Sequence, residues 1–407
     1  LISPFYRHDR GWRNKVCAVK NKSLGLMFFV VFVDLLGFGI MIPMLPFYAR
    51  SMGADSIQIG LLMAAYSAFQ ILASPFWGSL SDRKGRRPVL LLTIAGQSAG
   101  FFLAAMAPSY AWLIVSRSIA GMFGGNIAVA SAYVADVTDE SERSKGMGLI
   151  GAAFGLGFVF GPAIGGLLIS YGAHWPSIVA GGLAFLNLLG VFKFVPEPLS
   201  DSSRRSANRR TWALKDLREI LSRVEIVVPI LMFFFFTFAF VQLEVTFGLF
   251  VTSEFGYSER ASGLLLAMVG IMMAIVQGGL LGRITKIFGD ERLVWIGSFI
   301  LGLGLIFLSA AVENWMIYAA LMILAVGYSL ANPCLQAIVS KAAGQERRGS
   351  VMGIYQSGAG LARILAPIAA GVFYHVNSRY PMKLGALIVI GAAALWTVRL
   401  MWGQPKE

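Results

Sequence analysis

Four ionisable side chains lie inside long apolar stretches of the sequence. Asp34 stands in VFVDLLGFGIMIPMLPF, Glu244 in VQLEVTFGLF, Arg117 in SRSIAGMFGG and Arg363 in AGLARILAP. A charged group surrounded by hydrocarbon is costly and is by default functional. A carboxyl group there can bind and release a proton, because burial and a neighbouring cation change its acidity in opposite directions. We therefore expect Asp34 to carry protons, with Arg117 as its partner and Glu244 as a second candidate.

Each of these side chains also has a simpler interpretation that the sequence leaves open. Asp34 can instead bind a cationic substrate directly, or bind substrate and proton in competition. Arg117 is near enough to the membrane surface to extend its guanidinium group toward water, and Glu244 can be a residue at the membrane rim. Arg363 lies on one helical face with Gln356 and suits either substrate contact or structural pairing.

A dense cluster of charges separates two of the apolar stretches. The segment GSLSDRKGRRPVLLL, residues 78–92, carries one acid, Asp82, among four bases: Arg83, Lys84, Arg86 and Arg87. Bases alone fix the orientation of a membrane loop, so the acid needs another explanation. Asp82 can face the positive N-terminal end of a helix. An arginine can pair with an acid of YVADVTDESER, either Asp136 or Asp139. We interpret this loop as a latch between parts of the molecule.

The composition places these residues in a membrane protein. Of the 407 residues, 57% are hydrophobic and 14% charged, and the mean hydropathy is +0.70. Apolar stretches of about 20 residues recur, each able to cross the bilayer as a helix, and strand-like alternation is absent. Because backbone groups in lipid must be hydrogen-bonded internally, we predict an all-α membrane protein with twelve transmembrane helices in two six-helix pseudo-repeats. The predicted spans are 24–46, 57–80, 88–107, 111–135, 144–169, 176–195, 226–253, 259–284, 292–312, 316–341, 347–375 and 381–402.

The basic residues predict the orientation of these spans. Most of the 34 lysines and arginines fall on one side, together with both termini. Short cytoplasmic loops collect positive charge, so this side is predicted to be cytoplasmic. Basic loops resting against anionic headgroups explain the net charge of +13 without any nucleic acid. The two cysteines and three histidines are scattered, so we expect neither a disulfide framework nor a metal site.

A long hydrophilic stretch divides the chain into two halves. We predict a cytoplasmic tail at 1–23, a six-helix bundle at 24–195, a cytoplasmic linker with an amphipathic helix at 196–225, a second six-helix bundle at 226–402 and a cytoplasmic tail at 403–407. A shift of 205 residues superimposes several glycines of the two halves, and Pro162 on Pro367. Duplicated halves with a binding site between them are typical of secondary transporters.

The chain resembles the major facilitator superfamily, and within it the twelve-span drug:proton antiporters and their tetracycline-efflux branch. The charged loop fits the family pattern G-x-L-x-D-R-x-G-R-[RK] at Gly78, Asp82, Arg83, Gly85, Arg86 and Arg87. The resemblance covers about residues 24–402 and implies the major facilitator fold. It also implies that Asp82 meets the start of the eleventh helix and that Arg86 pairs with Asp136, closing the cytoplasmic side in the outward-open state.

Two further motifs fit the same family. GLIGAAFGLGFVFGPAIGG resembles the fifth-span motif of antiporters, with Gly151, Gly155, Gly161, Pro162, Gly165 and Gly166 in place. Small residues let helices approach closely, and a proline bends a helix. SRSIAGMFGG fits the fourth-span pattern that includes Arg117. The second-half counterpart of the charged loop, GRITKIFGDERL, has Thr285 near the place of the acid, so we expect a degenerate latch there.

The features specific to tetracycline efflux do not follow. Gln58 stands where those proteins carry a histidine, and Gly100 and Leu301 stand where they carry intramembrane acids. This argues against metal-chelated tetracycline as the substrate. The aromatic run FFFFTFAF and several methionines can line an adaptable apolar cavity or can face lipid. The candidate cavity residues are Phe38, Met41, Gln242, Asn332, Gln336, Gln356 and Arg363.

We therefore predict a secondary active transporter that exports an amphipathic or apolar small molecule in exchange for protons, as in multidrug efflux. The expected partners are that substrate, protons and the lipid bilayer, with no cofactor, and we expect a monomer in a bacterial cytoplasmic membrane. The same scaffold also suits a lipid, siderophore or metabolite exporter or facilitator, and a non-transporting membrane sensor is a remote alternative. An enzyme is not expected, because no nucleophile–base set, metal cluster or ATP-binding loop stands out.

Overall fold

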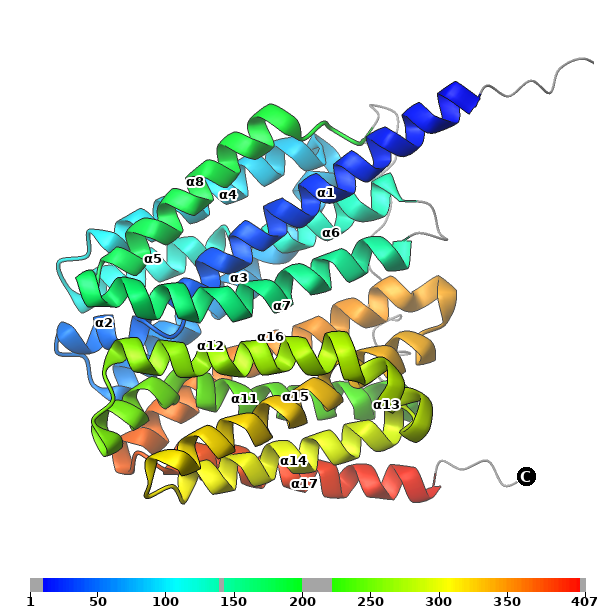
Figure 1. Ribbon diagram of the computed structural model, residues 1–407. Helices are drawn as coiled ribbons and strands as arrows, with labels where there is room; N and C mark the ends of the chain where they lie inside the picture. Colours follow the sequence, from blue (N-terminus) through cyan, green and yellow to red (C-terminus); the bar gives the residue numbers. More distant parts are fainter. Residues whose placement is uncertain (1–9, 139–142, 200–221, 403–407) are drawn as a thin grey trace, which may run out of the picture.

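The computed structural model describes residues 10–138, 143–199 and 222–402, which form helices joined by short connections (Figure 1). The helices of the first half are α1 (Arg10–Met41), α2 (Leu45–Ser51), α3 (Ser56–Lys84), α4 (Arg86–Ala105), α5 (Tyr110–Met122), α6 (Asn126–Val137), α7 (Arg143–Leu168), the short η1 (Ile169–Tyr171) and α8 (Trp175–Phe194). Those of the second half are α11 (Val224–Phe255), α12 (Glu259–Ile275), the π-helical turn η3 (Val276–Leu280), α13 (Leu281–Phe288), α14 (Asp290–Ser309), α15 (Asn314–Ala342), α16 (Gly344–Val376) and α17 (Tyr380–Trp402).

The twelve predicted spans are confirmed, with differences at their ends. Among the described residues, eleven helical segments are long and apolar enough to cross a membrane, and the shorter apolar helix Gly155–Tyr171 adds a twelfth. Helix α1 begins at Arg10 rather than at residue 24, so part of the predicted N-terminal tail is helical, although the apolar segment does begin at Leu24. The amphipathic helix predicted in the linker lies outside the described residues.

Local sequence explains where helices begin and turn. Helix α3 starts with a capping box in which Oδ1 of Asp55 accepts from the backbone N–H of Gln58 at 2.8 Å, while Oε1 of Gln58 accepts from the N–H of Asp55 at 2.9 Å. Gly85, between α3 and α4, has a φ of 107°, and its second-half counterpart Gly289 has a φ of 74°. Because residues with a Cβ rarely adopt this conformation, both turns require glycine, which supports the predicted repeat.

The helices lie side by side in two groups, α1–α8 above and α11–α17 below in Figure 1. Helix α1 begins and α17 ends at the same end of the bundle, on the right in this view. We call this end the terminal side and the opposite end the far side. The groups meet mainly through α3 with α16 and through α7 with α12. These contacts are equivalent under the repeat, because the second span of each half packs on the fifth span of the other.

Buried apolar side chains show where the two groups share a core. One cluster combines first-half residues such as Met44 and Phe47 with second-half residues such as Val245, Leu249 and Ala370. These residues stand near the far-side ends of α1, α2, α11 and α16. The two other clusters of the described residues each belong to a single half. The halves are therefore packed together at the far side.

Glycines bring the backbones of the two halves into contact at this same end. A Cβ on Gly263 of α12 would lie 2.6 Å from the Cα of Gly166 on α7. A Cβ on Gly60 of α3 would collide with the carbonyl oxygen of Pro367 on α16 and lie 3.3 Å from the Cα of Gly371. The repeat relates the two contacts, because Gly60 corresponds to Gly263 and Gly166 corresponds to Gly371.

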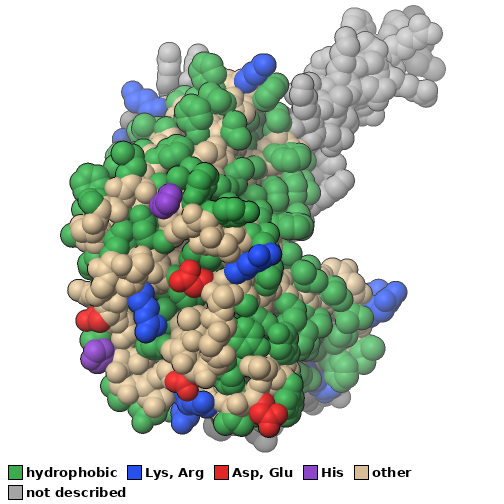
Figure 2. Space-filling view, turned by 60° about the vertical axis from the view of Figure 1, so that its left-hand side comes forward, with side chains coloured by type: hydrophobic (Ala, Val, Ile, Leu, Met, Phe, Trp, Pro, Cys, Tyr) green, Lys and Arg blue, Asp and Glu red, His purple; other side chains and the backbone are tan. Residues whose placement is uncertain are grey.

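The molecular surface has a hollow between the two groups of helices, toward the terminal side. Figure 2 brings the far side forward and shows a continuous surface over both groups there, with a notch between them at the right-hand edge, toward the terminal side. Many large hydrophobic side chains are exposed around the bundle, as helices in contact with lipid tails require. The described conformation is therefore closed at the far side and hollowed toward the terminal side.

Candidate functional site

Asp34 lies in a buried polar cluster formed by three helices of the first half. The side chain is 7% exposed, and its Oδ1 accepts a hydrogen bond of 2.6 Å from Nδ2 of Asn126. The same Nδ2 donates to Oε1 of Gln97 at 2.7 Å. Asp34 belongs to α1, Gln97 to α4, and Asn126 is the first residue of α6. We call Asp34, Gln97 and Asn126 the acid cluster; the sequence marks the two amides only as polar residues inside predicted spans.

Arg117 is buried near the acid cluster without forming an ion pair with Asp34. Its guanidinium carbon stands 4.5 Å from the ring centroid of Tyr66, a cation–π contact, and Nε and Nη1 have no hydrogen-bond partner. The charges of Asp34 and Arg117 both act on the Tyr66 hydroxyl. Phe38, predicted to line a cavity, packs on the same ring with centroids 5.2 Å apart. The expected Asp34–Arg117 pair is thus replaced here by a contact of Arg117 with an aromatic ring.

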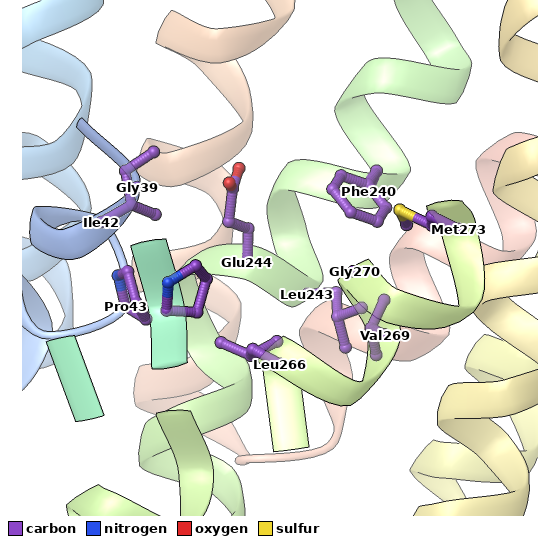
Figure 3. Close-up of a pocket in the computed structure, with 11 residues that line it drawn as sticks. Gly39, Ile42, Pro43, Phe240, Leu243, Glu244, Leu266, Val269, Gly270 and Met273 are labelled. Atoms are coloured by element: carbon purple, nitrogen blue, oxygen red, sulfur yellow. The ribbon is translucent and has the colours of Figure 1, made fainter. Parts of the chain in front are cut away.

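A cavity lies between the two halves. Its walls come from α1 and the turn that follows it, and from α7, α11 and α12. The lining residues are Gly39, Ile42, Pro43, Pro162, Phe240, Leu243, Glu244, Leu266, Val269, Gly270 and Met273, and all of them except Pro162 are labelled in Figure 3. Ten of these residues are apolar. The exception is Glu244, whose carboxylate points away from Leu266 and toward the space between Gly39 and Phe240 (Figure 3). The cavity therefore offers apolar walls and one acidic group.

Arg363 connects this cavity electrostatically with residues of both halves. Its positive charge, on α16, acts on Glu244 of α11, on Tyr328 of α15 and on Tyr66 of α3. Asn332, another predicted cavity residue, donates from Nδ2 to the hydroxyl of Tyr328 at 3.4 Å. The predicted residues Arg363, Glu244 and Asn332 therefore belong to one polar region of the second half, which faces Tyr66 in the first half.

The other predicted cavity residues lie elsewhere in this conformation. Met41 is buried inside the first half, where its Sδ accepts a hydrogen bond of 3.2 Å from Oγ of Ser177 on α8. Gln242 is fully buried, and neither of its amide atoms has a partner. Met41 directly precedes the lining residue Ile42, and Gln242 directly precedes the lining residue Leu243, but neither Met41 nor Gln242 lines the cavity itself. Gln336 and Gln356 are exposed and do not line the cavity between the halves.

The predicted latch residues meet at the terminal side. Nε of Arg86 donates to Oδ2 of Asp136 at 2.7 Å, and Nη1 donates to Oγ of Ser81 at 2.7 Å. Nη1 also lies 2.5 Å from Oδ1 of Asp82. Arg86 thus contacts Asp136 as the family resemblance implies, and it also pairs with Asp82 of its own loop. The side chains at the start of the eleventh helix, residues 344–350, lie outside the description.

Glu197 completes the latch and was missed in the sequence. Its carboxylate oxygens accept from the backbone N–H groups of Arg86 at 3.0 Å and of Arg87 at 2.9 Å. These residues open α4, so Glu197 caps a helix N-terminus, where a negative charge is favoured. The signal was a single acid in PEP, directly before a Ser/Arg-rich stretch. Of the other loop residues, Gly78 has open space where a Cβ would be, and Arg83 is exposed.

The second half carries an ion pair of opposite polarity at the equivalent place. Nζ of Lys341 lies 2.5 Å from Oδ2 of Asp290. Asp290 opens α14 as Arg86 opens α4, and Lys341 stands near the end of α15 as Asp136 stands near the end of α6. Thr285 takes no part, because its hydroxyl bonds back to its own helix. The counterpart of the Arg86–Asp136 pair is therefore kept with acid and base exchanged, whereas Thr285 stands near the place of Asp82.

The glycine-rich motif lies on α7 and packs against two other helices. Its predicted members are Gly151, Gly155, Gly161, Pro162, Gly165 and Gly166. A Cβ at Gly161 or Gly165 would lie 2.5 Å from the backbone of α1, and one at Gly166 would lie 2.9 Å from α12. A Cβ at Gly155 would meet nothing within 4 Å. The far-side part of the motif is therefore a packing surface, whereas Gly155 makes no close contact in this conformation.

The site can bind protons, attract a cation and accommodate apolar molecules. Its acids are dispersed, and among the described residues no three or more His, Cys, Asp or Glu side chains are grouped to hold a metal ion. Asp34 and Glu244 stand on different helices in different halves. The chemistry of this arrangement is therefore that of ion binding and release beside an apolar cavity.

Comparisons with known proteins point in the same direction. The family model described as Major Facilitator Superfamily matches residues 27–308 and 251–407. The class C tetracycline resistance protein of Escherichia coli is 34% identical over 93% of this chain and 96% of its own length. Multidrug resistance protein 2 of Bacillus subtilis (strain 168) is 27% identical over 93% of this chain and 94% of its own. The solved structure of the human organic anion transporter MFSD10 (TETRAN) has a TM-score of 0.69 at 26% identity, covering 93% of this chain and 99% of that one.

Proposed function

The chain belongs to the major facilitator superfamily, and we propose that it exports an amphipathic or apolar small molecule in exchange for protons. It is a multi-pass membrane transporter rather than an enzyme, and it is related to tetracycline and multidrug efflux proteins. The proposal goes beyond this relationship by naming the coupling ion, the direction of transport and the chemical character of the substrate.

The observation that carries the proposal is the carboxylate of Glu244 in an otherwise apolar cavity between the halves. Small-molecule pockets are mostly apolar with a few placed polar groups, and the residues that line this cavity have that character. Apolar walls favour a lipophilic molecule, and the single acid favours a positive charge on it. A lipophilic cation therefore fits the cavity better than an anion or a strongly hydrated molecule.

Two acids are proposed to couple transport to protons. Glu244 lines the cavity and cannot be protonated and paired with a cationic substrate at the same time, so substrate and proton would exclude each other there. Asp34 is buried beside Asn126 and is not among the residues that line the cavity, which suits a site for the proton alone. Exchange follows if loading of one site favours release from the other.

Alternating access is proposed to arise from rocking of the bundles at 24–195 and 226–402, joined by the linker at 196–225. The far side is closed by residues of both halves, so the cavity would be reached from the terminal side. We propose that this side and both termini lie in the cytoplasm, in a bacterial cytoplasmic membrane, because short cytoplasmic loops collect positive charge. Arg86, Asp82 and Asp136 stand at the end that must close in the outward-facing state, where we propose that Asp82 meets the start of α16.

Proteoliposomes test the proposal with ethidium, a lipophilic cation, as the probe. A pH gradient is imposed, and its dissipation is followed with a trapped pH-sensitive dye before and after ethidium is added. We expect ethidium-dependent dissipation with the wild-type protein and none with Asp34→Asn, in which the carboxyl group can no longer take up a proton. Ethidium binding, measured by fluorescence anisotropy, should persist in the variant.

The possible outcomes separate the alternatives. Gradient-driven transport by Asp34→Asn at the wild-type rate would remove Asp34 from the coupling mechanism and leave Glu244 as the candidate. Ethidium binding without proton movement in the wild type would favour a sensor. If ethidium neither binds nor moves, thermal stabilisation of the purified protein by a panel of lipids, siderophores and metabolites tests the other exporters on this scaffold.

A further inference from the structure

We infer that Asn126 is a positioning residue, which holds the Asp34 carboxylate and links it to the latch at the terminal side. The inference rests on the proposed role of Asp34 in proton coupling and adds the route by which a proton at Asp34 acts on the rest of the molecule. It follows from three observations: the hydrogen bonds of the Asn126 amide, its place at a break in the fourth span, and the register of two antiparallel helices.

The amide of Asn126 is fully engaged and has only one possible orientation. Its Oδ1 accepts a hydrogen bond of 2.9 Å from the backbone N–H of Ile127, so the NH₂ group must face the other way. That group donates to Asp34 at 2.6 Å and to Gln97 at 2.7 Å, which uses both of its hydrogens. The side chain is 3% exposed. An amide fixed in this way recognises an ionised carboxylate, because it can only donate.

The break in the fourth span places this amide. Helix α5 ends at Met122, and α6 begins at Asn126. A Cβ on Gly124 would lie 2.8 Å from the hydroxyl oxygen of Tyr66, and one on Gly125 would lie 2.6 Å from Trp77, so the intervening turn packs directly on α3. As the first residue of the new helix, Asn126 stands in the core at the level of Asp34 rather than on the helix surface.

Helices α4 and α6 carry the acid cluster and the latch in matching register. They pack against each other and run in opposite directions, with Gln97 beside Asn126 and Arg86 beside Asp136. Eleven residues separate Arg86 from Gln97 and ten separate Asn126 from Asp136, so the two levels are about 15–16 Å apart at 1.5 Å per residue. Each helix thus connects one member of the acid cluster rigidly to one member of the latch.

Protonation of Asp34 changes the strength of its hydrogen bond with Asn126. A hydrogen bond to an ionised carboxylate is roughly twice as strong as one between neutral groups. When Asp34 takes up a proton, its hold on Asn126 weakens, and α6 is freer to move relative to α1. Because α6 also carries Asp136, the change reaches the Arg86–Asp136 pair without any residue between them having to titrate.

The other charged groups near Asp34 do not provide the same connection. Arg117 of α5 contacts Tyr66 of α3, and both Arg117 and Arg363 of α16 act on that ring. Helix α7 has no titratable residue between positions 146 and 168, and on α8 Lys193 lies in the last turn, at the terminal side. On α6 itself, Asp136 is paired with Arg86, and Tyr133 bonds to the carbonyl of Pro196. Asn126 therefore joins Asp34 to the latch helix α6 by a hydrogen bond, and Gln97 on α4 belongs to the same cluster through its bond with Asn126.

The first test compares Asn126→Ala with Asn187→Ala in the full-length protein in proteoliposomes. Asn187 is a matched control, because it is 8% exposed and donates from Nδ2 to the backbone oxygen of Val30 on the same helix α1, at 2.9 Å. Ethidium-driven proton movement is measured between about pH 5 and pH 9. Loss of a donor that favours the ionised form should move the midpoint of the pH profile of Asn126→Ala upward by about one to two pH units. Asn187→Ala should keep the wild-type midpoint.

The second test follows the terminal side directly. Spin labels are placed on Lys193→Cys and Lys286→Cys, exposed positions of the two halves, in a chain whose two native cysteines are replaced. In the wild type, the distribution of label distances should change between acid and alkaline pH. In Asn126→Ala the same distances should be present, but their populations should respond less to pH, whereas Asn187→Ala should respond as the wild type does.

The outcomes distinguish this inference from the proposed function. If Asn126→Ala shows the midpoint and the distance response of Asn187→Ala, the inference is wrong while proton coupling at Asp34 stands. If Asp34→Asn keeps full gradient-driven transport, the proposed role of Asp34 fails whatever Asn126 does. Asn126→Ser retains one donor and serves if the alanine variant does not fold; its midpoint should move upward by a smaller amount, and an unchanged midpoint would overturn the inference.

Discussion

Arg117 is a buried base that forms no ion pair with Asp34, the nearby buried acid. Its side chain is 2% exposed, and a buried charge without a partner is destabilising by several kcal/mol. The ring of Tyr66 offsets part of this cost through the cation–π contact. Asp34 acts on the same ring but accepts its hydrogen bond from Asn126. The guanidinium group is therefore available to pair with a carboxylate when the conformation or the protonation of the acid cluster changes.

Substitution of Arg117 tests whether its guanidinium group takes part in transport. Arg117→Ala should reduce ethidium-driven proton movement at least about tenfold, because both the charge and the ring contact are lost. Arg117→Lys should retain an intermediate rate, since the charge survives but the forked donor geometry does not. Rates are normalised to the amount of folded protein in the proteoliposomes. Equal rates for the alanine and lysine variants would mean that the charge itself is not used.

Residue types in the sequence were enough to find Asp34 and Glu244, because an acid between apolar runs has no role in ordinary packing. They were not enough to find Asn126 and Gln97. An amide inside a span carries no charge, and its importance lies in a bond to a residue 92 positions away in the case of Asn126. The predicted pairing of Arg117 with Asp34 differs from the contact in the structure for a related reason. Two side chains can lie at similar depths in the membrane and still contact different neighbours on other helices.

Helix pairs close the far side through two equivalent contacts. The pair α3–α16 meets at Gly60 and Gly371, and the pair α7–α12 meets at Gly263 and Gly166. Glycine allows the backbones to touch, as is usual where membrane helices pack closely. Because the repeat relates the two contacts, they separate together when the halves rock. The far side can therefore close in this way only because these positions carry no side chain.

Alanine at these glycines should push the far side open. Gly60→Ala and Gly263→Ala each place a Cβ against backbone atoms of the other half, and overpacking of this kind costs roughly 1–3 kcal/mol. A balanced two-state equilibrium should then shift about tenfold or more toward the conformation in which these helices are apart. Gly155→Ala, on α7 but in open space, is the matched control. Distances between spin labels on the far side report the shift, and an equal distribution in all three variants would contradict the expectation.

The positions of the spans were predictable from hydropathy, but their interruptions were not. Helix α5 gives way to α6 at residues 123–125 and a π-helical turn separates α12 from α13, each at a pair of adjacent glycines, Gly124–Gly125 and Gly278–Gly279. Many glycines in this chain lie in unbroken helices, so the pair alone does not identify a break. The break at Gly124 is fixed by contact with Tyr66 and Gln70 of another helix. Such tertiary contacts are invisible in the sequence of one span.

At the scale of the whole molecule, the two halves have the same fold and different chemistry. The first half holds Asp34 and Arg117 inside its bundle, whereas the second half holds Glu244 and Arg363 near the cavity between the halves. The ion pairs on the terminal side have exchanged polarity. A common fold suits the proposed joint movement of both halves, and the different side chains suit the proposal that one half responds mainly to protons and the other mainly to substrate.

Accessibility of single cysteines tests the orientation and the open side together. Cysteine is introduced at Ser109 on the far side, at Lys286 on the terminal side and at Met273 in the cavity, in a chain without Cys17 and Cys334. A membrane-impermeant maleimide added to intact bacterial cells should label Ser109→Cys, because the proposed orientation has the basic terminal side in the cytoplasm and the far side outside. Lys286→Cys should be labelled only after the membrane is permeabilised.

Met273→Cys distinguishes a fixed structure from an alternating one. In the conformation with the far side closed, the cavity is reached only from the terminal side, so intact cells should leave this cysteine unlabelled. When Gly60→Ala and Gly263→Ala are added and the far side is pushed open, external reagent should reach the cavity and label it. Ser109→Cys, which stands outside the cavity, should label equally in both backgrounds. Labelling of Lys286→Cys in intact cells would reverse the orientation and with it the proposed direction of transport, whereas a cavity cysteine that never becomes accessible from outside would argue against alternating access.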